Sequence, residues 1–499
     1  MKFKVKDVDI ATGGTLVCIL NKKDADFLDM HIHDRVRLTK GNRSTVAALD
    51  IAESGKAVPV GSIGLMEEVL KKLRVKQGDT VKIIVDEKPK SVALIKKKLA
   101  GKRLDASEMT EIIVDLVANR LTQVEVTYFV AATYMKGLDL DETVALTKAM
   151  INTGEILHLD KHPVIDKHCI GGVPGNRTTM IVVPILVAAG YTVPKTSSRS
   201  ITSPAGTADT MEVIAKVDHD MKKIKKVVEK TGGCMVWGGA VNMAPADDKI
   251  ITVEHPLSID AEGQMLASIL AKKGSVSASH VLIDIPVGRG AKVKNMKKAV
   301  HLEKMFKKIA KKIGIKVKVA ITDGSQPIGN GIGPGLEARD VLYVLRNDER
   351  APLDLRNKAL LMAGAIMNAW PLNKKMKRKG FYQAKQILES GKAFEAFERM
   401  VVAQGKKTLD PDKIKLGKFT FDVKARCKGK IQYIDNKSIA RIAKAAGTPH
   451  DKESGIDLYF RVGDKVKKGD KIFTVYAKSK KKLDYAKKIV RLYDGVVVS

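Results

Sequence analysis

The spacing of apolar and polar residues changes several times along the chain, and each change marks a segment with a different expected structure. Residues 1–86 alternate apolar and polar positions over short runs such as Thr15 to Leu20 and Thr80 to Val85. A period of two is typical of half-buried strands. It predicts a β-rich N-terminal domain over 1–86, with one helical segment from Ser62 to Leu73.

A helical period begins at Val92, after the short linker 88–90. Helix-start signals stand near Asp105, Gln123 and Leu140, and each is followed by apolar residues three and four positions apart. These segments predict a helical lobe over residues 90–160.

Residues 161–406 alternate short apolar runs with amphipathic segments. Strand-like runs such as Val281 to Val287 and Val317 to Ile321 are separated by helical runs such as Asn295 to Ile313. This alternation predicts an α/β lobe with a mainly parallel sheet covered by helices on both faces. Short β-rich runs broken by Gly-Asp turns then predict an α+β C-terminal domain over 413–499. The predicted fold class is therefore multidomain α/β.

One expected strand–helix junction carries the strongest chemical signal. It reads Asp-Lys-His-Cys-Ile-Gly-Gly-Val-Pro-Gly-Asn-Arg-Thr-Thr from Asp166 to Thr179. Such a junction presents backbone N–H groups and the positive end of a helix, and here Lys167, Thr178 and Thr179 add further donors. The loop therefore predicts a phosphate site. It is not a Walker loop, because no Gly-Lys-Ser/Thr follows the glycines.

A second loop of small hydroxyl residues runs from Lys195 to Asp209, between another extended segment and another helix. We expect these two loops to face one another at the carboxyl ends of neighbouring parallel strands, where open α/β sheets bind their ligands. Together they predict a pocket for a polyanion that requires no metal. The four cysteines are scattered without ligand spacing, so neither a disulfide framework nor a zinc site is indicated.

The net charge of +33 raises the question of nucleic acid. The lysine runs are spread over the whole chain, aromatic residues are only 5%, and no nucleic-acid-binding motif accompanies them. We therefore expect solvated, anion-attracting surfaces and no specific nucleic-acid partner. The longest apolar run, Met180 to Ala189, is too short to span a bilayer and no signal-peptide pattern begins the chain, which favours a cytoplasmic protein without a membrane partner.

Four ordered motifs resemble those of the thymidine phosphorylase superfamily, the pyrimidine nucleoside phosphorylases. They are the two loops, Ala244-Pro-Ala-Asp-Asp-Lys249 and Ala267-Ser-Ile-Leu-Ala-Lys-Lys273. Within this superfamily the chain looks most like the archaeal AMP phosphorylases, which share its extra N-terminal domain and the segments Ile170 to Asn176 and Ser258 to Asp260. The resemblance implies a cleft between the helical lobe, on which residues 245–275 pack, and the α/β lobe.

The resemblance also implies site residues. Phosphate is expected at Lys167, Thr178, Ser197 and Thr207, and the base side at Ser268 and Lys272. Asp260 is expected to donate a proton to the leaving base, although the same residue would also suit a helix N-cap. Arg289 is a candidate partner for the 5′-phosphate beside Lys292. The implied AMP contacts are Gly172, Ser198, Arg199, Ser200, Ile201, Thr202, Ser203, Thr207, Ser268 and Lys292.

The implied reaction converts AMP and phosphate to adenine and ribose 1,5-bisphosphate, with CMP and UMP as candidate secondary substrates. No metal or cofactor is expected, only inorganic phosphate as co-substrate. The resemblance further implies a homo-oligomer, at least a dimer, enlarged through the terminal domains. Two positions depart from the pyrimidine-specific pattern: Val253 replaces an arginine that reads the pyrimidine, and Cys169 replaces a serine that follows the loop histidine.

Three alternatives remain open on the sequence. A pyrimidine nucleoside phosphorylase would act on unphosphorylated nucleosides. The second loop also resembles that of anthranilate phosphoribosyltransferase, which uses a magnesium-bound pyrophosphate substrate. A non-catalytic polyanion-binding protein would show no turnover and a steep salt dependence.

Overall fold

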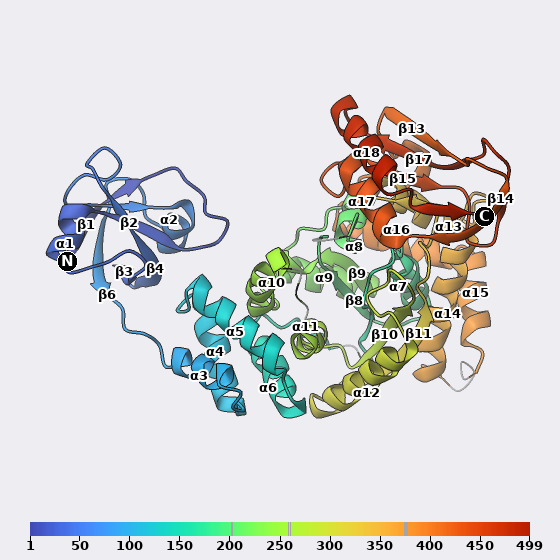
Figure 1. Cartoon of the computed structure of the whole chain (residues 1–499). Helices are drawn as coiled ribbons and strands as arrows, with labels where there is room; N and C mark the ends of the chain where they lie inside the picture. The colour runs from blue at the N-terminus through green and yellow to red at the C-terminus, as the bar shows by residue number, and fades with distance from the viewer. Residues whose placement is uncertain (161, 201–202, 258, 260, 374–377) are drawn as a thin grey trace. The chain divides into compact units, whose positions relative to one another are not determined.

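The structure is a computed structural model of the 499-residue chain, and it describes every residue except 161, 201–202, 258, 260 and 374–377 (Figure 1). The chain forms two compact units. The first comprises residues 1–153 and 245–267, and the second comprises residues 154–244 and 268–499.

A closed six-stranded barrel forms the N-terminal part of the first unit. Its strands lie in the order β1-β5-β2-β4-β3-β6 around buried aliphatic side chains such as Leu20 and Leu38. Two short helices, α1 and α2, accompany it. The elements are β1 (Lys2–Asp7), β2 (Val17–Asn21), α1 (Lys22–Phe27), β3 (Arg35–Lys40), β4 (Arg43–Ala52), β5 (Ser62–Leu65), α2 (Glu67–Leu73) and β6 (Thr80–Val85).

The prediction of a helix from Ser62 to Leu73 is wrong for the first four residues of this range. Ser62–Leu65 is strand β5, and only Glu67–Leu73 is helical. β5 pairs with β1 in parallel and with β2 antiparallel, and it buries Ile63 and Leu65 in the barrel. The barrel pairing overrides a local pattern that was compatible with a helix.

The rest of the first unit is helical. α10 packs on α4, α5 and α6. Asp105, Thr122 and Asp139 each begin a helix with a capping box, in which a glutamate three residues later bonds back to the cap. The helices are α3 (Ser91–Leu99), α4 (Ala106–Val117), α5 (Gln123–Lys136), α6 (Leu140–Asn152) and α10 (Pro245–Leu257).

The second unit is built on parallel strands, as the alternating pattern predicted. β10 pairs in parallel with β7 and β11, and β8 pairs in parallel with β9. A parallel bridge between Val164 and Thr192 connects the two groups. The strands are β7 (Ile165–Cys169), β8 (Val193–Ser197), β9 (Gly233–Trp237), β10 (His280–Val287) and β11 (Lys316–Asp323).

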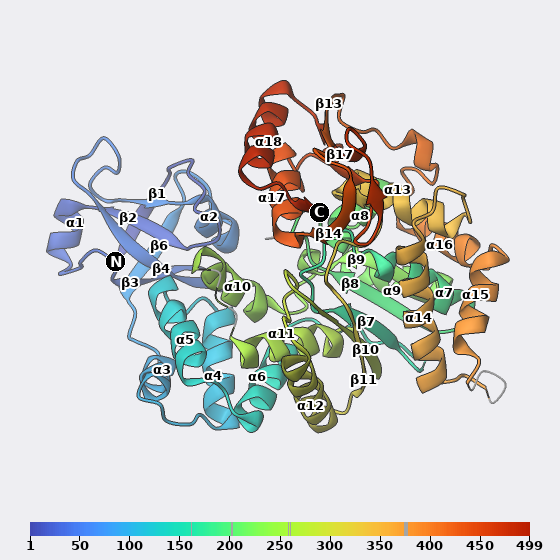
Figure 2. The same cartoon turned by 45° about the vertical axis from the view of Figure 1, so that its right-hand side comes forward.

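Helices cover these strands, as Figure 2 shows. α7 contributes to an extensive apolar core, with most of its side chains fully buried. The helices are α7 (Thr178–Ala188), α8 (Thr207–Ile214), α9 (Met221–Thr231), α12 (Met296–Lys312), α13 (Pro334–Leu345), α14 (Leu353–Ala369), α15 (Gly380–Glu389) and α16 (Lys392–Gln404). A further helix, α11 (Glu262–Gly274), begins in the first unit and ends in the second.

The C-terminal part of the second unit combines two small sheets with two helices. One sheet has the order β12-β15-β17-β13 and the other β16-β14-β18. β12 is only Gly331–Ile332 and precedes α13 in the chain, yet it pairs antiparallel with β15. The other elements are β13 (Phe419–Lys424), β14 (Gly429–Ile434), α17 (Asn436–Ala446), β15 (Gly455–Leu458), β16 (Lys465–Val466), β17 (Lys471–Ala477), α18 (Lys480–Leu492) and β18 (Val496–Val498).

Candidate active site

Both predicted anion loops leave the same edge of the sheet. β7 ends at Cys169 and β8 at Ser197, and the two strands run in the same direction where Val164 pairs with Thr192. The carboxyl end of β10, at Val287, lies at this edge as well because β10 is parallel to β7. The edge therefore gathers the segments 170–177, 198–200, 203–206 and 288–292, as expected for a ligand site in an open α/β sheet.

Lys167 lies beneath the first loop and is only 1% exposed. Its Nζ donates to Thr178 Oγ1 at 2.8 Å and to Thr179 Oγ1 at 3.4 Å, at the start of α7. Burial lowers the pKa of Lys167, and the carboxylate of Asp284, 3.7 Å away, opposes that shift. The structure thus places together two of the predicted phosphate ligands, Lys167 and Thr178.

Arg177 connects the first loop to the second. Its guanidinium donates to Glu337, to the backbone carbonyl of Ala205 and, at 3.4 Å, to Thr207 Oγ1. These contacts bring Thr207 close to the helix start that carries Thr178. The donors of Arg177 therefore link the two loops.

The second loop is held by Asp209. Its Oδ2 accepts the backbone N–H groups of Ser200 at 2.7 Å and Gly206 at 2.9 Å, so this side chain fixes the loop to the start of α8. Lys452 donates to its other oxygen at 3.2 Å. Within the loop the hydroxyls of Ser200 and Ser203 lie 3.0 Å apart.

Arg199 projects from the same loop onto α8 and β9. It makes two 2.7 Å hydrogen bonds to Glu212 and lies 4.7 Å from the ring centre of Trp237. Ile201 and Thr202, two further predicted AMP contacts, lie outside the described residues. Ser198 follows directly on β8, which carries Ser197.

The predicted AMP residues Gly172 and Lys292 touch through their backbones. A Cβ on Gly172 would lie 2.3 Å from the backbone nitrogen of Lys292, and the φ of Gly172 is +89°. Arg289, in the same turn as Lys292, stacks on Tyr433 with 4.4 Å between its guanidinium carbon and the ring centre. The close approach requires glycine at position 172.

Gly172→Ala is expected to reduce AMP turnover by about tenfold or more, because the new methyl group must displace the backbone of the Lys292 turn. Gly171→Ala is the matched control. Gly171 also has a positive φ, +102°, but a Cβ there meets nothing within 4 Å. Steady-state rates at varied AMP, with melting curves for both variants, measure the difference. Equal losses in the two variants would show that backbone strain, and not contact with the Lys292 turn, is responsible.

The predicted base-side residues Ser268 and Lys272 lie one turn apart on α11, and Lys272 Nζ donates to Ser268 Oγ at 3.3 Å. Asp260, the predicted proton donor, and Ser258 lie outside the described residues. The next lysine, Lys273, is buried and donates to Asp166 Oδ2 at 2.6 Å. This ion pair between α11 and β7 was not expected from the sequence.

The two residues after Lys167 are both uncharged at neutral pH. Burial and the neighbouring lysines Lys273 and Lys195 lower the pKa of His168 well below its ordinary value. Burial and Asp284 raise the pKa of the Cys169 thiol to about 11, and Asn176 donates to its Sγ at 3.3 Å. Neither side chain therefore adds charge to the loop.

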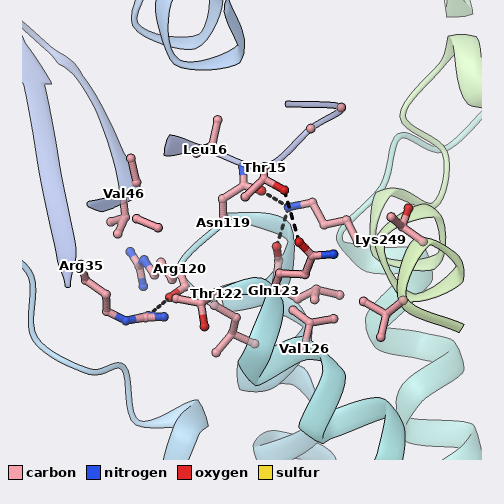
Figure 3. A pocket seen from close by; sticks show the side chains of 18 residues that line it. Thr15, Leu16, Arg35, Val46, Asn119, Arg120, Thr122, Gln123, Val126 and Lys249 are labelled. Carbon is pink, nitrogen blue, oxygen red and sulfur yellow. Dashed lines mark hydrogen bonds between the residues drawn. The ribbon is translucent and has the colours of Figure 1, made fainter. Parts of the chain in front are cut away.

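A separate cavity of about 250 Å³ lies in the first unit, between barrel strands and the helices α4, α5 and α10 (Figure 3). Its walls are largely apolar and include Val253. The cations at its rim already have acceptors: Lys249 donates to the carbonyls of Leu116 at 2.6 Å and Val117 at 3.1 Å, and Arg35 donates to Arg120 O and to Glu125. Lys249 and Arg35 are therefore already occupied by protein acceptors.

In the described part of the chain, no group of three or more His, Cys, Asp and Glu side chains is placed to hold a metal ion. Among the same residues, no helix is long and apolar enough to cross a membrane.

Comparisons with known proteins agree with this architecture. Residues 92–154 match the helical bundle domain and residues 161–394 the a/b domain of a glycosyl transferase family, and residues 430–493 match the pyrimidine nucleoside phosphorylase C-terminal domain. Anthranilate phosphoribosyltransferase from Thermus thermophilus shares the fold at a TM-score of 0.53 and 19% identity, covering 62% of this chain and 98% of that one. Anthranilate phosphoribosyltransferase from Saccharomyces cerevisiae matches at a TM-score of 0.51 and 13% identity, covering 63% of this chain and 97% of that one. The chain thus has the fold of a glycosyl transferase that acts on pentosyl groups.

Close relatives of the chain identify the family within this class of glycosyl transferases. AMP phosphorylase 1 of Archaeoglobus fulgidus and AMP phosphorylase of Pyrococcus furiosus are each 43% identical, covering 100% of this chain and 98% of the relative. A putative thymidine phosphorylase of Legionella pneumophila strain Paris is also 43% identical, covering 94% of this chain and 89% of the relative. The chain belongs to the AMP phosphorylase family of the thymidine and pyrimidine nucleoside phosphorylase superfamily.

Proposed function

We propose that this enzyme cleaves AMP with inorganic phosphate, giving adenine and ribose 1,5-bisphosphate. The observation that carries the proposal is the 43% identity to AMP phosphorylases over the whole chain, including the N-terminal barrel. The cation and hydroxyl donors beneath and around the two loops support it, because they suit an oxyanion substrate. CMP and UMP are proposed as further substrates, and no metal or cofactor is required.

In the proposed reaction, phosphate binds at Lys167, Thr178, Ser197 and Thr207. One of its oxygens attacks C1′ of the ribose as the bond from C1′ to the adenine nitrogen breaks, through an oxocarbenium-like state. The departing adenine carries the bonding electron pair and takes up a proton, which we assign to Asp260. Binding both substrates in a site held by two linked loops supplies the proximity that the displacement needs.

The test is phosphate-dependent release of free base from AMP, CMP, UMP and dAMP, with adenosine, uridine and thymidine run alongside. We expect release from AMP that requires phosphate and survives EDTA. A nucleoside phosphorylase is the second candidate, because the putative thymidine phosphorylase of Legionella is also 43% identical to this chain. Turnover of thymidine or uridine without turnover of AMP would select this second function. Binding of RNA without any base release would indicate a polyanion-binding protein instead.

An exposed apolar stripe on α5 supports the proposed homo-oligomer. Val124, Tyr128 and Met135 are 64%, 54% and 76% exposed and stand at spacings that share one face of the helix. Light scattering is expected to give at least a dimer, and Tyr128→Glu with Met135→Glu is expected to shift the mass toward the monomer. Tyr382→Glu, at an exposed position on α15, is the control. A wild-type monomer at working concentration would contradict the proposal.

A further inference from the structure

A buried cluster beneath the first loop has no role in the function proposed so far. Asp284 on β10 lies in the same sheet as Lys167 and is fully buried. Its Oδ2 lies 3.7 Å from Lys167 Nζ and 3.3 Å from Nζ of Lys358, on α14. Thr322 on β11 donates to its Oδ1 at 2.6 Å. Three strands and a helix therefore meet at one carboxylate.

This cluster holds more positive than negative charge. Two ammonium groups share the single Asp284 carboxylate, and Lys358 Nζ, on a residue only 8% exposed, has no hydrogen-bond partner in the described part of the chain. The other charged or titratable groups around Lys167 do not change this count. Arg177 is paired with Glu337, and Cys169 is a neutral thiol. A buried, unbalanced cation is costly unless an anion joins it.

We propose that Asp284 and Lys358 are positioning residues for phosphate binding: Asp284 holds the Lys167 ammonium at Thr178, and Lys358 shares Asp284 so that the three groups together keep a net positive charge for the substrate. The inference rests on the proposed function, because it takes Lys167 as a phosphate ligand. It adds two residues to the site that lie behind the ligands.

The physical argument compares two arrangements of charge. A buried one-to-one pair of Lys167 and Asp284 would present almost no net charge to an arriving phosphate, and the carboxylate would repel it. With Lys358 on the same carboxylate, the three groups together carry one positive charge. The phosphate dianion then enters a site whose charge is not already balanced, while Asp284 still fixes the direction of Lys167.

The first test is Lys358→Met, which keeps an unbranched chain of similar length and removes the charge. We expect the KM for phosphate to rise about tenfold while kcat with AMP stays within about twofold, since no reacting atom is touched. Lys385→Met, which breaks a surface pair with Glu389 on α15, is the matched control and should change neither constant. If Lys358→Met does not fold, Lys358→Gln provides the same charge loss with a polar side chain.

The second test is the pH dependence of phosphate KM between about pH 7 and about pH 10. Asp284 raises the pKa of Lys167 and Lys358 lowers it. In Asp284→Asn, Lys167 therefore loses its proton at a lower pH, and phosphate affinity should fall earlier as the pH rises. The double variant Asp284→Asn with Lys358→Met also lacks the Lys358 ammonium, which lowers the pKa of Lys167. Its curve of phosphate KM against pH should therefore move back toward that of the wild type. If Asp284→Asn does not fold, Thr322→Val weakens the hold on Asp284 and should raise phosphate KM about threefold.

The outcomes separate two failures. No phosphate-dependent base release from the wild type would overturn the proposed function itself. An active wild type with unchanged phosphate KM in folded Lys358→Met or Lys358→Gln would overturn the inference alone. In the double variant, the effects of the two substitutions on phosphate KM could simply add, with no shift of the pH curve back toward the wild type. That result would assign the cluster to structural stability and would also overturn the inference.

Discussion

Lys167→Ala is expected to lower phosphate-dependent turnover of AMP by roughly one and a half to three and a half decades. The variant loses a buried ammonium that contacts Thr178 at 2.8 Å and, in the proposed reaction, the attacking phosphate. Truncating one partner of a desolvated, hydrogen-bonded charge pair costs about 2–5 kcal/mol, and each ~1.4 kcal/mol is tenfold. Rates at varied phosphate concentration measure the effect, which should fall mainly on phosphate binding.

The Lys167 variant should remain folded, because Asp284 keeps Lys358 as a partner at 3.3 Å. Lys167→Arg is expected to fail as well, since a planar fork does not replace a compact ammonium at a position only 1% exposed. Lys222→Ala, at an exposed lysine of α9, controls for the general loss of positive charge. Wild-type phosphate dependence in folded Lys167→Ala would remove this lysine from the site.

Asp260→Asn is expected to lower AMP turnover by roughly two to four decades, the range that general acid catalysis contributes. Asparagine keeps the size and the capping oxygen of aspartate but has no acidic proton to give. UMP should be affected less, because uracil can leave with its charge delocalised onto carbonyl oxygens, whereas adenine leaves through a protonated ring nitrogen. Steady-state rates with both nucleotides test the difference.

A matched control separates acid catalysis from helix capping. Asp220 begins α9 and accepts the backbone N–H of Lys223 at 2.7 Å, so Asp220→Asn repeats the same exchange at an established cap. We expect Asp220→Asn to keep wild-type rates. A stable Asp260→Asn variant with near-normal AMP turnover would limit Asp260 to a capping role.

Much of the fold follows from local sequence pattern, because parallel strands and their covering helices have different periods. β10 reads as a continuous apolar run and α12 as an amphipathic helix, and both occur where predicted. β5 could not be predicted in this way. Ile63 and Leu65 fit either a strand or the start of a helix, and only pairing with β1 and β2 decides between them.

The candidate site likewise has parts that local sequence predicts and parts that depend on tertiary packing. Its two loops are visible in the sequence because glycine, serine and threonine cluster at strand ends. The partners that fix them are not visible, because they come from distant segments. Arg177 meets Glu337 160 positions later in the chain. Lys167 shares Asp284 with Lys358, which lies on a helix without any motif that points to the site. Such contacts depend on tertiary packing, which spacing along one chain does not report.

The pairing of β12 with β15 has a consequence for how the chain is made. Gly331 and Ile332 leave the ribosome long before their partners Asp457 and Ile456, so that edge stays open while more than a hundred residues are synthesised. Unpaired strand edges in nascent chains invite pairing with other chains. A two-residue strand containing glycine exposes little of such an edge. The sheet that contains β12 is therefore completed only after Ile456 and Asp457 have been synthesised, and a chain stalled before them would keep this edge uncovered.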